Sequence, residues 1–208
     1  RAPAEAPRTA VVVADGARGT MIQAQDPTLE DYEGVEGCNE ILNVSRPDII
    51  AAVHDAYLEV GVDAIETNTF GANWSNLSDY DIDDRIRELA AAGARIARER
   101  ADAHATADHP RWVLGSMGPG TKLPSLGHTT YAHRRDTFAE QDAGLLTGGA
   151  AALRPPAVPR AAVGDRPARQ VRVVHADDPT LPLPLAGALE RVRVHDANLT
   201  IRTVTDRA

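Results

Sequence analysis

Short apolar runs alternate with stretches of helical periodicity three times along the first 150 residues. The runs are VVV at 11–13, which meets the polar turn ADG at 14–16, then VDAIETNTF at 62–70 and WVLGSMG at 112–118. A short apolar run that stops at a polar turn is typical of a buried strand. The pattern therefore predicts three strands, each followed by a polar loop.

Three helices are predicted after these strands. The first begins at SRPD, residues 45–48, with a capping serine, an early proline and an acidic first turn, and it ends at Gly61. The second covers residues 83 to about 103, and the third covers 131–146 and ends at the glycine pair 148–149. Positions at helical spacing are expected to face inward: Ile49, Ile50, Val53, Ala56, Tyr57 and Val60, then Ile86, Leu89, Ala90, Gly93, Ile96 and Ala97.

Strand, polar loop and helix in repeated succession indicate a parallel α/β fold. In such folds the loops that follow the strands gather at one edge of the sheet, and active sites lie there. The polar and small residues at the predicted strand ends are therefore candidate site residues: Asp15, Gly16, Ala17, Glu66, Asn68, Thr69, Ser116 and Gly118.

The composition changes after residue 150. Residues 151–208 hold seven of the fourteen prolines and nine arginines against six acidic residues, and they show no helical period. Prolines at this density are incompatible with an ordinary helix or a central strand. The alternating pieces VRVVH at 171–175 and RVRVHDANLTIRTV at 191–204 are compatible with a hairpin. We otherwise expect an irregular tail.

Charge and cysteine content exclude several classes of function. The formal net charge of -8 argues against a nucleic-acid partner, because binding to phosphates requires clustered cations. No apolar run reaches the ~18 residues that span a bilayer, so we expect no membrane partner. Cys38 is the only cysteine, which rules out an internal disulfide and a multi-thiolate metal site and favours a cytoplasmic setting.

Five motifs carry a family resemblance. They are DGARGTMIQ at 15–23, GCNEIL at 37–42, RPDII at 46–50, ETNTFGAN at 66–73 and GSMGPGTKLPSLGH at 115–128. In this order and spacing the chain resembles the N-terminal homocysteine S-methyltransferase module of cobalamin-dependent methionine synthases. The stretch TKLPSLGH favours the cobalamin-dependent enzymes over relatives that use betaine or S-methylmethionine.

The resemblance implies a (β/α)₈ barrel in which zinc, held by three cysteine thiolates, activates the homocysteine sulfur for methylation by methylcobalamin. This chain would contribute the first three to four strand–helix units, as a partial barrel over residues 11–150. Residues 1–10 are expected to be disordered, and residues 151–208 to form a tail outside the family pattern. The turn Asp15-Gly16-Ala17 would face the amino-acid end of homocysteine, with Glu66, Asn68, Thr69 and Ser116 lining the same mouth.

Each candidate also has a purely structural interpretation. Asp15-Gly16 and the stretch 116–119 are turn sequences, and Glu66 and Asn68 are equally suited to pairing with loop backbone groups. The histidines His54, His128 and His133 lack a partner pattern and are interpreted as solvated or hydrogen-bonded. Cys38 is interpreted as a buried, inert thiol, because the zinc ligands of the family come from much later segments. We therefore assign neither a catalytic nor a metal-binding residue.

Two departures from the family pattern matter. Arg18 stands where the family usually has an apolar residue, which affects packing at the rim of the pocket. After residue 150 the family continues into a fourth strand that ends in a glutamate, whereas this chain reads AALRPP at 151–156, and no cysteine follows. An out-of-frame reading of a GC-rich gene yields an Arg-, Pro- and Ala-rich tail of this kind, so a frameshift or truncation is our hypothesis.

Three functions remain open from the sequence. By lineage the chain is a homocysteine S-methyltransferase of methionine biosynthesis, inactive alone, since neither zinc nor methylcobalamin is expected to bind it. The alternative is a non-catalytic remnant or weak homocysteine-binding module. A more distant option is an unrelated α/β protein whose tail forms an interaction hairpin. Homocysteine is the expected ligand, and the cobalamin and folate domains of the full enzymes are expected to be absent.

Overall fold

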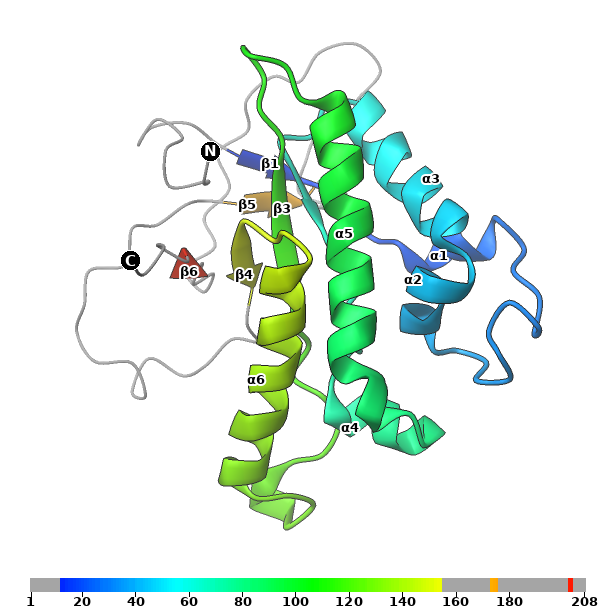
Figure 1. Ribbon diagram of the computed structural model, residues 1–208, viewed down its shortest axis with the longest axis vertical. Coiled ribbons are helices and arrows are strands. Elements are labelled where there is room, and N and C mark those ends of the chain that lie inside the picture. The colour runs from blue at the N-terminus through cyan, green and yellow to red at the C-terminus, as the bar shows by residue number, and fades with distance from the viewer. Residues whose placement is uncertain (1–11, 155–172, 176–201, 204–208) are drawn as a thin grey trace.

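The predicted parallel α/β arrangement is confirmed by a computed structural model, which describes residues 12–154, 173–175 and 202–203 (Figure 1). Four strands pair in parallel and in chain order: β1 (Val12–Ala14), β2 (Ala64–Glu66), β3 (Trp112–Ser116) and β4 (Ala152–Arg154). β4 aligns Arg154 with Ser116, so the strand–helix alternation continues for one strand beyond residue 150.

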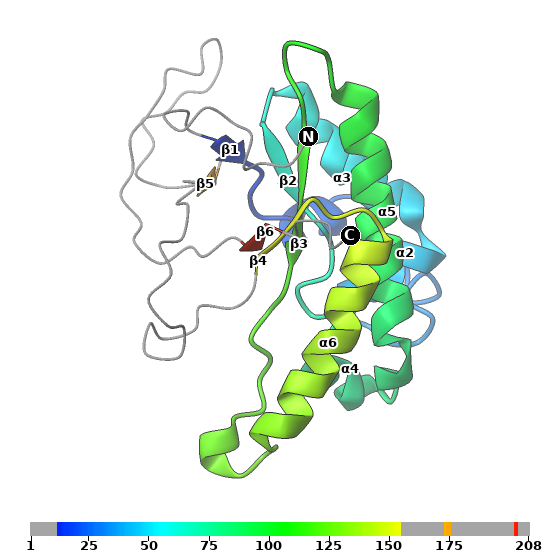
Figure 2. The same ribbon diagram turned by 60° about the vertical axis from the view of Figure 1, so that its left-hand side comes forward.

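Three long helices, α3 (Pro47–Glu59), α5 (Ile86–His104) and α6 (Tyr131–Thr147), cover one face of this sheet (Figures 1 and 2). Short helices occupy the loops that follow the strands: α1 (Gly19–Gln23), α2 (Leu42–Ser45) and α4 (Trp74–Leu77), with 3₁₀ turns at 39–41, 78–80, 83–85 and 124–126. Alternate strand residues face the helices, because successive side chains point to opposite sides of a strand. Val13, Ile65, Val113 and Leu153 pack there.

Most of the predicted helix pattern is confirmed. All six inward positions of α5 are buried, and α6 begins at Tyr131 and ends before Gly148 as predicted. Pro47 opens α3, and Gly61 adopts a φ of 96°, which suits a glycine cap. The capping role of Ser45 was predicted wrongly, because Ser45 ends α2 and its hydroxyl donates to Ile41 O. Val60 was also predicted to be buried but is 67% exposed, because it follows the last turn.

The described parts of the tail do not form the hairpin considered above. β5 (Val173–His175) pairs in parallel with β1, and β6 (Arg202–Thr203) pairs antiparallel with β4. These two strands therefore lie at opposite edges of the sheet. The remaining tail residues, and the predicted disorder of residues 1–10, lie outside the described residues.

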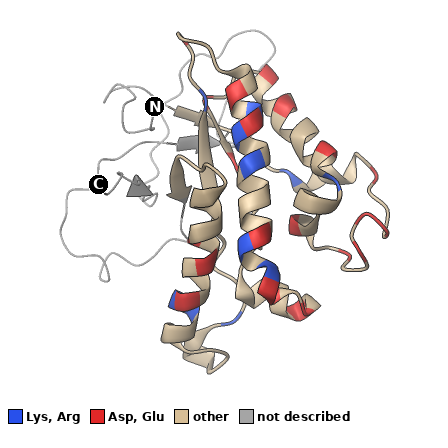
Figure 3. Ribbon diagram, in the orientation of Figure 1, with Lys and Arg blue, Asp and Glu red and all other residues tan. Residues whose placement is uncertain are grey.

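Charges of both signs alternate along the outer faces of α5 and α6 (Figure 3). Several form local ion pairs on α5, such as Arg98 with Asp102 and Arg85 with Glu88. Exposed pairs of this kind each contribute little to stability. Within the described residues, no helix has the length and apolar character needed to cross a membrane.

Helices α5 and α6 approach closely through small residues. A Cβ atom on Gly144 would lie 2.6 Å from Arg87 O and 2.8 Å from Ala90 Cβ, and one on Gly148 would lie 2.5 Å from Ala91 O. Real side chains do not tolerate such distances, so α6 can hold this position only with glycine at both sites. The contact fixes α6 against the sheet and brings Gln141 beneath the loops described below.

Gly144→Ala is expected to lower the free energy of unfolding by about 1–3 kcal/mol, because the added methyl group overpacks the α5–α6 interface. Urea denaturation followed by circular dichroism measures the change. Gly19→Ala is the matched control, since a Cβ there meets nothing within 4 Å. If Gly144→Ala and Gly19→Ala have the same free energy of unfolding, the close α5–α6 contact does not require glycine at position 144.

His54, on α3, contradicts the interpretation of this histidine as solvated or hydrogen-bonded. Its side chain is fully buried, and among the described residues neither ring nitrogen has a hydrogen-bond partner. Burial, with smaller contributions from Arg18 and Arg100, lowers the pKa of His54 to about 3. The ring is therefore neutral in the folded chain, whereas a histidine in the unfolded chain has a pKa near 6.5.

Because the unfolded state binds the extra proton, His54 is expected to reduce stability as the pH falls below 6.5. The loss between pH 7 and pH 5 is about 2 kcal/mol at 1.36 kcal/mol per pKa unit. His54→Leu should remove it, so the stability difference between this variant and the native chain should grow in favour of the variant on acidification. His128→Gln, which replaces an exposed histidine, serves as the control. If the free energy of unfolding changes with pH in the same way for the native chain and for His54→Leu, His54 is not the buried neutral group inferred here.

Candidate functional site

Three of the predicted site residues converge where the parallel strands end. Asp15 follows β1, Glu66 ends β2 and Ser116 ends β3. The Glu66 backbone N–H donates to Asp15 Oδ1 at 2.9 Å, and the Ser116 hydroxyl donates to Glu66 Oε2 at 2.9 Å. Their exposed fractions are 0%, 6% and 3% respectively. The strand ends thus hold two buried carboxyl groups and a hydroxyl in one connected cluster.

Arg18 completes this cluster, although the sequence suggested only an effect on packing. Its Nη2 donates to Asp15 Oδ2 at 3.1 Å and lies 4.0 Å from Glu66 Oε2. Its Nη1 donates to the carbonyl of Thr67 at 2.8 Å. The side chain is 13% exposed, so its charge faces the two carboxyl groups with little screening by water.

Asp15 is electrostatically perturbed. Burial raises its pKa to about 6, the charge of Glu66 acts in the same direction, and Arg18 opposes both. A carboxylate taken out of water loses hydration, which favours the protonated form unless a cation or hydrogen bonds compensate. Asp15 is therefore ionised at neutral pH and becomes protonated in mildly acidic solution.

Asn68 and Thr69, two further predicted site residues, form hydrogen bonds beside the cluster. The Asn68 side-chain amide donates to Asn39 O at 2.8 Å and to Asn43 Oδ1 at 3.0 Å. The Thr69 hydroxyl donates to Ser116 O at 2.8 Å. Both side chains are buried, and these hydrogen bonds join them to the loops around the strand ends.

Gly16 and Ala17 form the open side of the site. Gly16 is half-buried and Ala17 is exposed, between β1 and α1. The Ala17 carbonyl accepts a hydrogen bond from the Tyr57 hydroxyl at 2.7 Å, which ties this turn to α3. The turn is thereby held beside the buried Asp15.

Other residues that position the site had not been singled out from the sequence. Glu40 Oε1 accepts from the Gly71 N–H at 2.7 Å, and Gln141 Nε2 donates to Thr69 O at 2.7 Å. Asn43 Nδ2 donates to Asn68 O at 2.8 Å. Gln141, a buried polar residue on the inward side of α6, is the clearest signal available in hindsight, while Glu40 lies within the GCNEIL motif.

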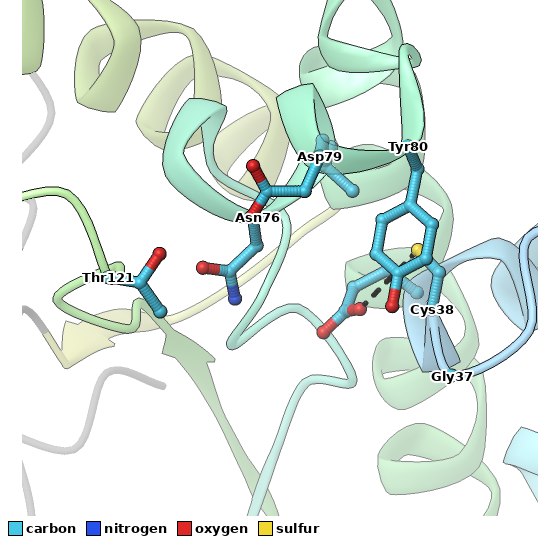
Figure 4. A pocket seen from close by; sticks show the side chains of 8 residues that line it. Gly37, Cys38, Asn76, Asp79, Tyr80 and Thr121 are labelled. Atoms are coloured by element: carbon cyan, nitrogen blue, oxygen red, sulfur yellow. Dashed lines mark hydrogen bonds between the residues drawn. The ribbon is translucent and has the colours of Figure 1, made fainter.

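A cavity of about 180 Å³ lies between the loops that follow the strands, where Glu40 forms part of its lining (Figure 4). Cys38 and Tyr80 lie at one end and Thr121 at the other, and the lining also includes Gly37, Glu40, Asn76, Leu77 and Asp79. Cys38 is 2% exposed, and its thiol lies 3.8 Å from Glu40 Oε2 as a donor. Burial and the neighbouring Glu40 raise the pKa of the thiol to about 12, so Cys38 is the inert thiol that was predicted.

The donor set does not fit the three-thiolate zinc site of the family. The chain has one cysteine, and its thiol is held in the protonated form. Among the residues that the structure describes, no three His, Cys, Asp or Glu side chains converge as metal ligands would. No step that passes through zinc is therefore assigned to these residues.

The remaining two histidines are interpreted correctly from the sequence. His128 Nδ1 accepts from the Leu123 N–H at 3.3 Å. His133 is exposed and its ring meets Trp74 edge-on, with 4.4 Å between centroids. Within the described residues, neither histidine takes part in the hydrogen bonds that join Asp15, Glu66 and Ser116.

Comparison with solved structures supports the same fold. The homocysteine methyltransferase MmuM from Escherichia coli, in its oxidized form, matches with a TM-score of 0.56 and 19% identity over 74% of this chain and 54% of that chain. Its metallated form matches with a TM-score of 0.56 and 20% identity over 69% of this chain and 52% of that chain. At such identities the likeness concerns the fold alone.

Sequence comparison is more specific. Methionine synthase of Mycobacterium tuberculosis (strain ATCC 25618 / H37Rv) is 59% identical over 143 residues, and that of Mycobacterium leprae (strain TN) is 57% identical over 143 residues. The match covers 69% of this chain and 12% of the length of either relative. The homocysteine S-methyltransferase family model matches residues 12–161. The chain therefore belongs to the homocysteine S-methyltransferase family.

Proposed function

We propose that this chain is the substrate-facing part of a homocysteine S-methyltransferase barrel, which binds homocysteine but does not methylate it alone. In this proposal residues 11–150 contribute the first strands of a partial (β/α)₈ barrel. The parallel order of β1 to β4 and the likeness to the Escherichia coli enzyme support it. The departure from the family after about residue 150, and its origin in a frameshift, are part of the proposal, and resequencing the gene region tests them.

The observation that carries the proposal is the buried cluster of Asp15, Glu66 and Ser116 at the strand ends. Homocysteine carries an ammonium group, a carboxylate and a thiol. The ionised Asp15 carboxylate in a poorly hydrated site is suited to an ammonium group, and the backbone N–H of Gly16 is suited to a carboxylate. The hydrogen bonds that join the three residues, one from the Glu66 backbone N–H and one from the Ser116 hydroxyl, hold these groups in place before a ligand arrives.

Methyl transfer requires groups that this chain does not supply. In the family zinc and methylcobalamin provide a thiolate nucleophile and a methyl donor, but the single thiol here is buried and protonated. The cobalamin and folate domains belong, in this proposal, to the longer relatives, of whose length the chain spans 12%. The residues present therefore bind and orient the amino-acid end of homocysteine, in a cytoplasmic setting.

L-Homocysteine added to the ¹⁵N-labelled chain under reducing conditions is expected to shift the amide signals of Gly16, Ala17 and Glu66. Because Asp15 has a pKa of about 6 and its carboxylate holds Arg18 and the Glu66 N–H beside the Gly16–Ala17 turn, affinity should fall as the pH drops below that value. Asp15→Asn should weaken binding at pH 7.5 and abolish this pH dependence. Asp48→Asn, which removes an exposed carboxylate paired with Arg46, should change neither. Absence of shifts at the strand ends would refute the proposal.

The purified chain is expected to retain no stoichiometric zinc and to form no methionine above background from homocysteine and methylcobalamin. Metal analysis after dialysis and chromatography of the products measure the two quantities. Cys38→Ser is the control, because it removes the only thiol. One zinc ion per chain that is lost in Cys38→Ser would contradict the assignment of Cys38 as an inert thiol.

A further inference from the structure

We propose that Arg18 occupies the place of a ligand's ammonium group between Asp15 and Glu66, and thereby limits which ligands this site accepts. The inference rests on the proposed function, since it concerns the same strand-end site. It adds a residue that determines specificity, at a position where the family resemblance leads us to expect an apolar side chain. The chain would carry its own cation in the site.

The geometry of Arg18 is that of a bound cation. Its Nη2 lies 3.1 Å from Asp15 Oδ2 and 4.0 Å from Glu66 Oε2, so one nitrogen faces both buried carboxyl groups. A ligand's ammonium nitrogen paired with the same two oxygens would have to lie in the same space. Nη1 is fixed independently by the Thr67 carbonyl at 2.8 Å, which keeps the guanidinium at the ends of both β1 and β2.

Charge balance explains why a cation is needed there. Asp15 is completely buried and Glu66 nearly so, and buried carboxylates are costly without a compensating charge. Arg18 provides that charge from only three residues along the chain. A tethered group acts at a high effective concentration, so a free ammonium group competes with Arg18 at a disadvantage. A second cation beside the guanidinium would also be repelled.

The opposite role, in which Arg18 binds the carboxylate of the ligand, fits the contacts less well. A guanidinium recognises a carboxylate best through two parallel N–H donors. Here Nη1 and Nη2 already donate to Thr67 and Asp15, and Nε is buried without a partner among the described residues. Both terminal nitrogens are therefore already engaged with the protein, and the carboxylate role becomes an outcome that the test must distinguish.

The test compares two probes that differ only in the ammonium group, L-homocysteine and 4-mercaptobutanoate. If Arg18 fills the ammonium position, the native full chain should bind both with similar, millimolar affinity. Arg18→Met, which removes the charge and keeps an apolar side chain, should bind L-homocysteine at least tenfold more tightly and 4-mercaptobutanoate no more tightly. Arg18→Lys should behave like the native chain, because it retains a cation. Isothermal titration calorimetry and the amide shifts of Gly16 and Ala17 measure affinity and location.

Different results would overturn the role of Arg18 and the binding of homocysteine. Arg46→Met, which disrupts exposed ion pairs with Asp31 and Asp48, is the matched control and should leave both affinities unchanged. A native chain that already prefers L-homocysteine tenfold, or an Arg18→Met variant that loses binding of both probes while remaining folded, would overturn the inference and leave homocysteine binding intact. Absence of binding to both the native chain and Arg18→Met would refute the proposed function together with the inference.

Discussion

The arrangement of the site depends on one buried hydrogen bond, from the Glu66 backbone N–H to Asp15 Oδ1 at 2.9 Å. This bond joins the end of β1 to the end of β2, where the regular pairing of the two strands gives way to loops. The acceptor is a buried carboxylate, and its negative charge must be compensated by the surrounding groups. Arg18 compensates that charge directly, and the Ser116 hydroxyl donates to the neighbouring Glu66 carboxyl group.

Side-chain hydrogen bonds hold the loops that follow β2 and β3, where the regular pairing of the strands ends. Thr67 links β2 to β3 by accepting the Ser116 N–H at 2.9 Å, and Thr69 and Gln141 satisfy the neighbouring carbonyl groups. Buried backbone groups that lose sheet pairing require such partners, since leaving them unpaired costs about 1–3 kcal/mol each. The polar residues behind the site therefore fix its position.

Sequence reasoning succeeded where the signal is local. The inward face of α5 follows from spacing alone, and Asp15, Glu66 and Ser116 could be placed together because parallel strands end at a common edge. The support from Gln141 and Glu40 could not be predicted, because a side chain that pairs with a distant backbone leaves no periodic pattern. The missed role of Ser45 has a different cause: two helices follow each other there, and capping depends on where the first one ends.

Arg18 and Cys38 show why residue type does not determine role at this edge of the sheet. A cysteine in a family that uses thiolates invites a metal assignment, yet burial next to Glu40 keeps the Cys38 proton in place. An arginine at an apolar position suggests altered packing, yet the nearby carboxyl groups turn it into part of the site. Burial, reinforced by Glu40, disfavours ionisation of the thiol, and the two buried carboxyl groups retain the guanidinium. Under the proposed function, the first strands would therefore prepare recognition of the ligand, whereas activation of a nucleophile would need metal ligands that the described strands do not provide.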